Sequence, residues 1–245
     1  MFQFDKNLEK KILNIKTKIF ADGADLGSMI ELNKLSYIKG LTTNPSLMRK
    51  AGINNYEKFA KSVLENVKEK PVSFEVFSDD HDEMYNQAKI ISSWGENAFS
   101  KIPICNTKNK YSYEIIKRLS DEGVKLNITA IMTKDQVDNV YKSLNKQTMS
   151  YVSIFAGRIA DTGRNPEELI KYAVKIKEDY KSEIIWASTR ELYNIFQSAD
   201  LNCDVITVTP EIIKKLNNLE KNLEEYSLDT VKMFYEDAKS AGYKI

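Results

Sequence analysis

Short runs of apolar or β-branched residues alternate along the chain with longer segments in which apolar residues recur every three or four positions. The length and residue types of the runs are typical of buried strands. We therefore expect eight strands, at residues 19–24, 37–43, 72–77, 98–104, 126–132, 151–159, 183–187 and 204–208.

The segments between these runs predict amphipathic helices. In the segment 54–70, apolar residues at positions 56, 59, 60, 63, 64 and 67 form one stripe at helical spacing, and 166–180 repeats this pattern. Thr133 and Gln136 have the spacing of a capping box, which opens another helix. Further helices are expected at 84–94, 113–119, 190–199 and 211–216, with an extra N-terminal helix before residue 19 and a C-terminal helix at 228–241.

A strand followed by a helix, repeated eight times, predicts an α/β fold with parallel strands. Such repeats form either a doubly wound sheet or a closed barrel. The chain has 245 residues, close to the roughly 250 of a typical (β/α)8 TIM barrel, so the barrel is favoured. Because no Pro-, Gly- or Ser-rich linker divides the chain, we expect a single barrel domain over residues 1–245. The crossover 25–36 is short and contains Gly27, and it fits the pattern least well.

The charge balance limits the classes of partner. The net charge is +1, from 36 basic and 35 acidic residues, which gives no electrostatic support for binding nucleic acid or an anionic membrane. No segment approaches the roughly 20 apolar residues of a membrane span. The charged segment 1–11 lacks the pattern of a signal peptide. We therefore expect a cytoplasmic protein.

Cysteine and histidine are scarce. Cys105 and Cys203 are too few for a disulfide scaffold. Together with His81, the only histidine, they do not support a transition-metal site, so no metal is expected. His81 lies in the polar run 78–82 and is predicted to be a solvated loop residue.

Polar residues interrupt several predicted strands near their C-terminal ends, where barrels of this class carry their active sites. Lys101 lies inside the apolar run 98–104. Burial lowers the pKa of a lysine, and a neutral amine is a nucleophile that forms imines with carbonyl compounds. The alternative is a lysine that reaches solvent from the end of its strand.

Two carboxylates occupy comparable positions. Asp22 ends the first run and is either a helix cap or a general acid/base. Glu75 lies between Phe74 and Val76. An unpaired glutamate buried there would have a raised pKa and could carry protons.

Uncharged polar residues complete the pattern. Asn44 follows the second run in a Thr-Asn-Pro-Ser segment that also has the signature of a turn. Because strand side chains alternate, Asn127 and Thr129 share one face of the fifth strand, and Ser153 and Phe155 share one face of the sixth.

Arg158, Ser188 and Arg190 lie just beyond the sixth and seventh runs. Barrels of this class often bind phosphate near their last strands, with bidentate arginine and hydroxyl donors. Taken singly, each arginine is typical of the protein surface. The coincidence of these residues with the lysine and the carboxylates favours a phosphate site.

At these residues the sequence resembles the transaldolase family, class I aldolases of the pentose phosphate pathway. The resemblance extends strand by strand over roughly residues 19–210. Its specific pieces are Ala-Asp-Gly-Ala-Asp at 21–25, Gly-Leu-Thr-Thr-Asn-Pro-Ser at 40–46, Lys-Ile-Pro at 101–103, Leu-Asn-Ile-Thr-Ala-Ile at 126–131, Ser-Ile-Phe-Ala-Gly-Arg at 153–158 and Ala-Ser-Thr-Arg at 187–190.

The resemblance implies a cofactor-free transferase. Lys101 would form a Schiff base with a ketose phosphate (sedoheptulose 7-phosphate or fructose 6-phosphate), and Asp22 would take the proton of the C4 hydroxyl. Glu75 and Thr129 would position a water that shuttles protons. The dihydroxyacetone unit would pass to glyceraldehyde 3-phosphate or erythrose 4-phosphate. The remaining implied substrate-binding residues are Asn44, Asn127, Ser153, Phe155, Arg158, Ser188 and Arg190.

A related branch, fructose-6-phosphate aldolase, releases free dihydroxyacetone. As that branch is understood, it carries glutamine and tyrosine where this chain has Glu75 and Phe155, so the resemblance favours transfer over net cleavage. The sequence departs from the family pattern at Gly23, Cys105 and Thr189, which leaves a paralogue acting on another phosphosugar as an alternative.

Two further alternatives for the function stay open. A non-catalytic barrel could bind a phosphosugar without turning it over. A pyridoxal-phosphate enzyme also uses a lysine imine, but the sequence has no glycine-rich phosphate cradle.

The C-terminal helix carries apolar residues at 231, 234, 235 and 238. It could pack on its own barrel, which is the commonest solution, cover the site, or meet a second copy in a homo-oligomer.

Overall fold

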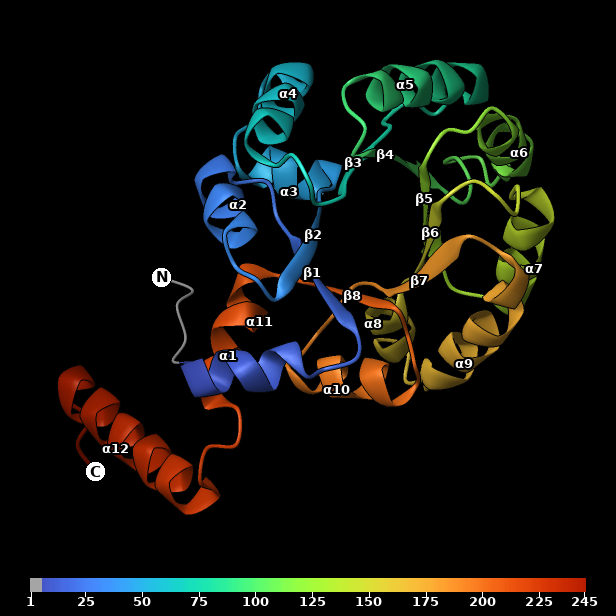
Figure 1. Cartoon of the computed structure of the whole chain (residues 1–245). Coiled ribbons are helices and arrows are strands. Elements are labelled where there is room, and N and C mark those ends of the chain that lie inside the picture. Colours follow the sequence, from blue (N-terminus) through green and yellow to red (C-terminus); the bar gives the residue numbers. More distant parts are fainter. Residues whose placement is uncertain (1–5) are drawn as a thin grey trace.

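The computed structural model describes residues 6–245 and contains a closed barrel of eight parallel strands in sequence order (Figure 1). Pairing of Lys18 with Val205 joins the first strand to the last, which rules out a doubly wound sheet. The strands are β1 Lys18–Asp22, β2 Ile38–Thr42, β3 Val72–Glu75, β4 Ala98–Pro103, β5 Leu126–Ile131, β6 Ser150–Ile154, β7 Ser182–Trp186 and β8 Val205–Val208. The (β/α)8 TIM barrel expected from the sequence is confirmed.

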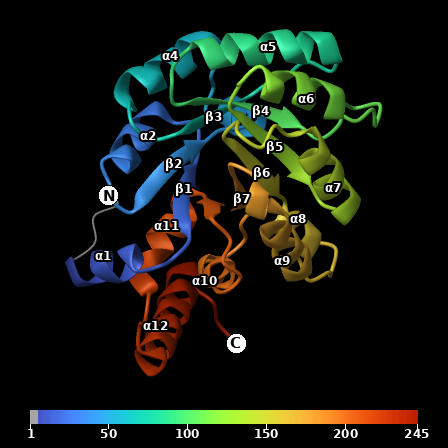
Figure 2. The same cartoon turned by 45° about the vertical axis from the view of Figure 1, so that its right-hand side comes forward.

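Helices form an outer layer around the strands, as Figures 1 and 2 show. The crossover helices are α2 Leu26–Asn33, α4 Tyr56–Asn66, α5 His81–Ser93, α6 Tyr113–Asp121, α7 Lys134–Ser143, α9 Glu167–Ile176 and α10 Tyr193–Asp200. Additional helices are α1 Lys6–Leu13, α3 Pro45–Lys50, α8 Ala156–Ala160, α11 Pro210–Lys214 and α12 Leu223–Ala241, with short 3-10 turns at Lys177–Asp179 and Lys215–Asn218.

Local sequence signals account for several helix boundaries. The capping box at Thr133 and Gln136 is present at the start of α7. The short first crossover forms α2 because Asp25 caps it, accepting a hydrogen bond from the backbone N–H of Ser28 at 2.8 Å. In α4 the predicted stripe buries Phe59 and Val63 against the barrel.

The barrel interior is filled below its C-terminal end. Phe20, Phe99 and Tyr151 form a buried aromatic cluster there, with Phe99 and Tyr151 ring centroids 4.7 Å apart. Gly40 makes room for it, because a Cβ on Gly40 would lie 2.6 Å from the Phe20 ring. The lower barrel is therefore a packed core, and the space for chemistry lies above this layer.

The sixth strand is shorter than its apolar run predicts. The strand ends at Ile154, and residues 156–160 form α8, so the expected strand at 151–159 is wrong beyond that point. Ala156 is fully buried and Ile159 packs against the core from the helix. An apolar run shows that a segment is buried but does not separate a strand from a short buried helix.

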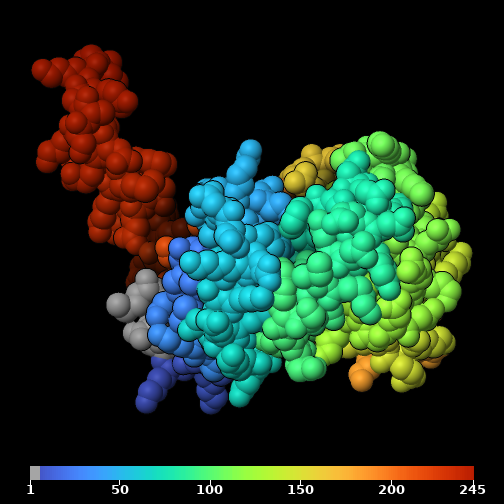
Figure 3. Space-filling model, turned by 90° about the horizontal axis from the view of Figure 1, so that it is seen from above, coloured from blue at the N-terminus to red at the C-terminus, as the bar shows by residue number. Residues whose placement is uncertain are grey.

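The C-terminal helix α12 begins five residues earlier than predicted and buries none of its side chains. Figures 1 and 3 show it in red, projecting away from the barrel. Of the three placements left open for this helix, packing on its own barrel is therefore wrong. Phe234 is 62% exposed and Tyr235 is 64% exposed, so the apolar stripe faces outward.

No helix within residues 6–245 is long and apolar enough to cross a membrane.

Candidate active site

A cavity of about 510 Å³ opens at the C-terminal end of the barrel. All eleven residues singled out from the sequence line it, although they come from different strands and loops. They are Asp22, Asn44, Glu75, Lys101, Asn127, Thr129, Ser153, Phe155, Arg158, Ser188 and Arg190. The cavity is also lined by Thr42, Pro45, Ser46, Leu47, Ala187, Thr189, Thr207 and Thr209.

The strand pleat explains why polar side chains converge above the aromatic layer. Asp22, Lys101 and Ser153 each lie two residues beyond one of the three aromatic residues of the lower barrel. Residues two apart on a strand point to the same face, so these three side chains also point inward. The layer above the aromatic cluster is therefore polar.

Lys101 is held inside the cavity and does not extend to solvent. The residue is 6% exposed, and its Nζ lies 3.0 Å from Glu75 Oε2. The Nζ also donates a hydrogen bond to the carbonyl oxygen of Thr43 at 3.0 Å. The register pairs Glu75 with Lys101 on adjacent strands, which brings the two side chains together. A lysine that reaches solvent from its strand end is thus excluded.

Asp22 lies across the cavity and does not cap a helix, since Asp25 caps α2. Burial raises the pKa of Asp22, while the charge of Lys101 and a hydrogen bond from Thr42 oppose that rise. The Thr42 hydroxyl donates to Asp22 Oδ1 at 2.8 Å, and it lies 2.6 Å from the hydroxyl of Thr207. The carboxyl is therefore oriented by a threonine pair.

A chain of hydrogen bonds fixes the amide side of the cavity. Ser153 Oγ donates to Asn127 Oδ1 at 2.7 Å, and Asn127 Nδ2 donates to Ser73 Oγ at 2.9 Å. Thr129 Oγ1 is buried and has no hydrogen-bond partner among residues 6–245. Asn44 accepts from the backbone N–H of Leu47 at 3.0 Å and so caps α3 while it also lines the cavity.

Sequence reasoning missed residues that support this cavity from neighbouring elements. The hydroxyls of Thr42 and Ser73 contact the predicted site residues Asp22 and Asn127, and the Thr207 hydroxyl contacts that of Thr42. The Tyr56 hydroxyl, from α4, donates to the backbone oxygen of Glu75 at 2.6 Å. The threonines could have been found by the same signal as Thr129, a hydroxyl within an apolar strand. Tyr56 could not, because it belongs to the apolar stripe of its helix.

The arginine corner is built from α8 and the loop after β7. Arg190 forms an ion pair with Asp161, in which Nε lies 3.0 Å from Oδ1 and Nη2 lies 2.5 Å from Oδ2. Ser188 has a φ of 64°, a left-handed conformation that is uncommon for a residue with a side chain. The Arg158 guanidinium carbon lies 6.0 Å from the centroid of the Phe155 ring. Both arginines line the cavity.

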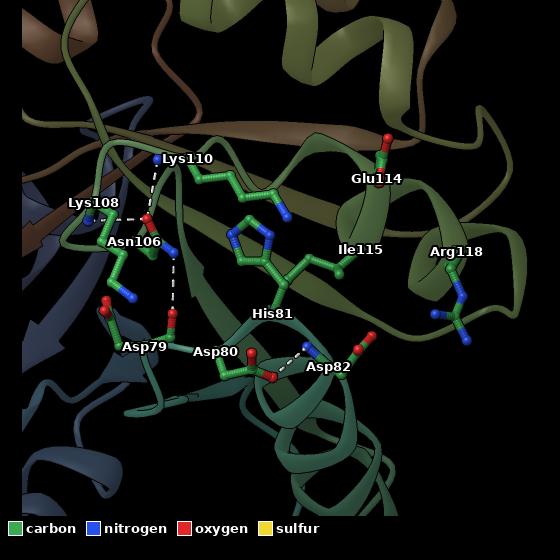
Figure 4. Close-up of a pocket in the computed structure, with 10 residues that line it drawn as sticks. All are labelled: Asp79, Asp80, His81, Asp82, Asn106, Lys108, Lys110, Glu114, Ile115 and Arg118. Carbon is green, nitrogen blue, oxygen red and sulfur yellow. Dashed lines mark hydrogen bonds between the residues drawn. The ribbon is translucent and has the colours of Figure 1, made fainter.

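A second pocket of about 510 Å³ lies between the ends of α5 and α6 (Figure 4). His81 points into it between Lys110 and Ile115. The prediction of a solvated loop position for His81 is wrong, since it is the first residue of α5 and its Nε2 is enclosed without a hydrogen-bond partner among the described residues. None of the eleven predicted site residues lines this pocket.

Within residues 6–245 there is no group of three or more His, Cys, Asp or Glu side chains placed to hold a metal ion. The charged groups of the main cavity are one lysine, two carboxylates and two arginines. The fold and this cavity define a (β/α)8-barrel protein with a buried lysine paired to a partly buried glutamate.

Comparison with known proteins identifies the family. A family model described as transaldolase/fructose-6-phosphate aldolase matches residues 19–245. The chain belongs to this family. A relative from Sulfurihydrogenibium sp. named "Probable transaldolase" is 33% identical over 201 residues, covering 81% of this chain and 88% of the relative. One from Nitrosopumilus maritimus with the same name is 32% identical over 226 residues, covering 91% and 96%.

Solved structures with little sequence identity share the fold. The crystal structure of 2,3-dimethylmalate lyase, of the PEP mutase/isocitrate lyase superfamily, superposes with a TM-score of 0.55 at 10% identity, covering 97% of this chain and 88% of that one. At this identity the likeness concerns the barrel fold alone.

Proposed function

We propose that this chain is a transaldolase that transfers a dihydroxyacetone unit between phosphorylated sugars through a Schiff base on Lys101. The observation that carries the proposal is the pair of buried Lys101 and partly buried Glu75, 3.0 Å apart, in a cavity that also contains Asp22. A buried lysine beside a proton acceptor is the arrangement that imine formation requires.

In the first step the Lys101 amine attacks the C2 carbonyl of a ketose phosphate. The ammonium must first lose a proton, and Glu75 is the nearest carboxylate that can accept it. Loss of water from the resulting carbinolamine gives a protonated imine. Thr129, whose hydroxyl is buried without a partner among the described residues, has a donor and acceptor available for the water that leaves.

In the second step Asp22 takes the proton of the C4 hydroxyl. The C3–C4 bond breaks, its electron pair passes to the iminium, and C4 leaves as the aldehyde of the shortened aldose phosphate. The remaining three carbons stay on Lys101 as an enamine. The raised pKa of Asp22 makes its carboxylate a stronger base than an exposed aspartate, which suits this proton transfer.

In the third step the enamine carbon attacks the aldehyde of an acceptor aldose phosphate. Asp22 returns its proton to the new hydroxyl, and water hydrolyses the imine to release the product. Asn44, Asn127 and Ser153 are the groups that can hydrogen-bond the hydroxyls of the three-carbon unit, since they line the same cavity. The iminium serves as the electron sink, so these steps need no further cofactor.

Arg158, Ser188 and Arg190 are the proposed ligands of the sugar phosphate. They lie together at the cavity edge after β6 and β7, which is the usual place for phosphate in this fold. Glu75 and Phe155 favour transfer over release of free dihydroxyacetone, because they match the transaldolase branch of the resemblance rather than its aldolase branch.

Chemical trapping tests the proposal. The protein is incubated with fructose 6-phosphate and borohydride, and the modified peptide is mapped by mass spectrometry. We expect an adduct with the mass of reduced dihydroxyacetone on Lys101 and none in Lys101→Ala. Labelling of Lys101→Ala at the wild-type level would overturn the assignment of the nucleophile. Addition of erythrose 4-phosphate then separates the two branches, because a transaldolase forms sedoheptulose 7-phosphate and an aldolase accumulates dihydroxyacetone.

A further inference from the structure

We propose that Asp161 is a positioning residue for the phosphate site. It binds one edge of the Arg190 guanidinium from outside the cavity, so that the other edge of the guanidinium faces the substrate phosphate. This inference rests on the proposed function, since it concerns the phosphate ligand of that site. Asp161 itself does not line the cavity, whereas Arg190 does.

The hydrogen-bond geometry divides the guanidinium into two edges. Asp161 occupies the edge formed by Nε and Nη2, with distances of 3.0 Å and 3.2 Å from Nε and 2.5 Å from Nη2. A guanidinium has five N–H donors in a fixed plane. Two of them bind Asp161, so both donors of Nη1 and one of Nη2 are left. A phosphate has the oxygen spacing to accept from such an edge.

The position of Asp161 follows from the packing of α8. Gly157 lies one helical turn before Asp161 and so on the same face of the helix. That face is pressed against the loop after β7, because a Cβ on Gly157 would lie 1.6 Å from the carbonyl oxygen of Ser188 and 3.2 Å from Arg190 Cγ. The backbone N–H of Asp161 donates to the Gly157 oxygen at 2.9 Å. The backbone of Asp161 is thus held close to the loop that carries Arg190.

The loop fixes the other end of Arg190. The backbone N–H of Arg190 donates to Asn194 Oδ1 at 3.0 Å, and Asn194 is largely buried at the start of α10. Between this backbone anchor and the Asp161 pair, both ends of a flexible side chain are held. An arginine ordered before binding loses less rotamer entropy when it meets the phosphate.

Even with its two-pronged geometry, this pair is expected to contribute only modestly to folding stability. The side chains of Arg190 and Asp161 are 46% and 54% exposed. Exposed ion pairs contribute little to stability because water and salt screen them. A bidentate contact that orients the guanidinium of Arg190 acts mainly on the binding of the substrate phosphate. The negative charge of Asp161 also disfavours a phosphate taking its place, so the carboxylate and the ligand use different edges.

Inorganic phosphate binding tests the inference without depending on turnover. Calorimetric titration is done with the wild type, Asp161→Asn, Arg190→Ala and the double variant, with Asp179→Asn as the control. Asp179 is an exposed partner of Lys146 in a comparable surface ion pair. We expect Asp161→Asn to weaken phosphate binding about two- to fivefold, a size set by the modest coupling of exposed ion pairs. It should have no effect in the Arg190→Ala background, because Asp161 acts through that residue.

The outcomes separate the two proposals. If Arg190→Ala does not weaken phosphate binding, the proposed phosphate site is wrong. If Arg190→Ala weakens binding but Asp161→Asn binds as tightly as the wild type, the positioning role is wrong and the phosphate site stands.

In the transfer reaction, Asp161→Asn should raise KM for fructose 6-phosphate and leave kcat unchanged. An equal loss in Asp179→Asn would point to a general effect of surface charge and overturn the inference.

Discussion

Asp22 and Asp25 are three positions apart, but their carboxyls lie in opposite environments. Burial raises the pKa of Asp22. Hydrogen bonds from Ser28 at the start of α2 lower the pKa of Asp25. Asp22 is the last residue of β1 and Asp25 lies three positions further on, directly before α2. Only the direction in which the chain leaves β1 decides that one faces the cavity and the other caps the helix.

The raised pKa of Asp22 predicts that its carboxylate costs stability. Because the pKa of Asp22 is raised in the fold, its protonated carboxyl contributes stability below the ordinary aspartate pKa. This contribution is lost as the pH rises through the raised pKa and the carboxyl ionises. We therefore expect Asp22→Asn to increase the free energy of unfolding in urea at pH 7, with a gain that shrinks toward the ordinary pKa of about 3.9. Transfer activity should fall about 10²- to 10⁴-fold, the usual range for loss of a general base.

Asp25→Asn is the matched control for this substitution. Because the pKa of Asp25 is lowered in the fold, its carboxylate stabilises the protein above the ordinary pKa, and this contribution is lost as the pH falls through the lowered value. The two substitutions should thus change stability at neutral pH in opposite directions. A loss of stability in Asp22→Asn would contradict the desolvation argument.

At the scale of elements, the arginine corner depends on how closely α8 approaches the loop after β7. The backbone N–H of Gly157 lies 3.4 Å from the Ala187 oxygen, and there is no room for a side chain at this position. The helix has five residues and no side-chain cap, so tertiary packing maintains it. The same contact holds α8, which carries Arg158, against the loop that carries Arg190.

Gly157→Ala tests this approach. The added methyl would overlap the backbone carbonyl of Ser188, which cannot move as a flexible side chain can. We expect a loss of about 1–3 kcal/mol in the free energy of urea unfolding, as is typical of overpacking, together with weaker binding of inorganic phosphate. Gly27→Ala is the control, since a Cβ there meets its nearest atom at 3.6 Å and α2 gains a better helix former. Equal stability of the two variants would show that α8 can move away at little cost.

At the scale of the whole molecule, α12 is separate from the layers that form the barrel. The strands, their aromatic filling and the surrounding helices form a closed arrangement, and α12 extends from it (Figure 2). Its apolar residues include Val231, Phe234 and Tyr235, all more than half exposed. The barrel core is complete without this helix.

Deletion of residues 223–245 tests the independence of the barrel. Because α12 buries no side chain, we expect the truncated chain to keep the wild-type midpoint of unfolding in urea. Light scattering on both chains gives their molar masses and tests the alternative that α12 meets a second copy in a homo-oligomer. A loss of stability together with a lower mass would contradict the prediction and would show that α12 is buried against another copy.

The sequence alone determined which residues are buried and at what spacing they recur. This pattern was sufficient to predict the barrel fold. Eight apolar runs and the stripes between them leave few arrangements that bury every apolar face. It also identified Lys101, Glu75 and Asp22 as polar residues within or at the ends of buried strands. A charge in such a position needs a partner or a function, because an isolated charge is costly to remove from water.

The tertiary structure decided what depends on contacts between distant segments. It paired Thr42 with Thr207, placed Asp161 on Arg190, turned residues 156–160 into a helix and left α12 outside the barrel. Periodicity records how deeply a residue is buried but not which neighbour it meets. That choice is made by strand register, by the close approach at Gly157 and by the direction in which the chain leaves each strand.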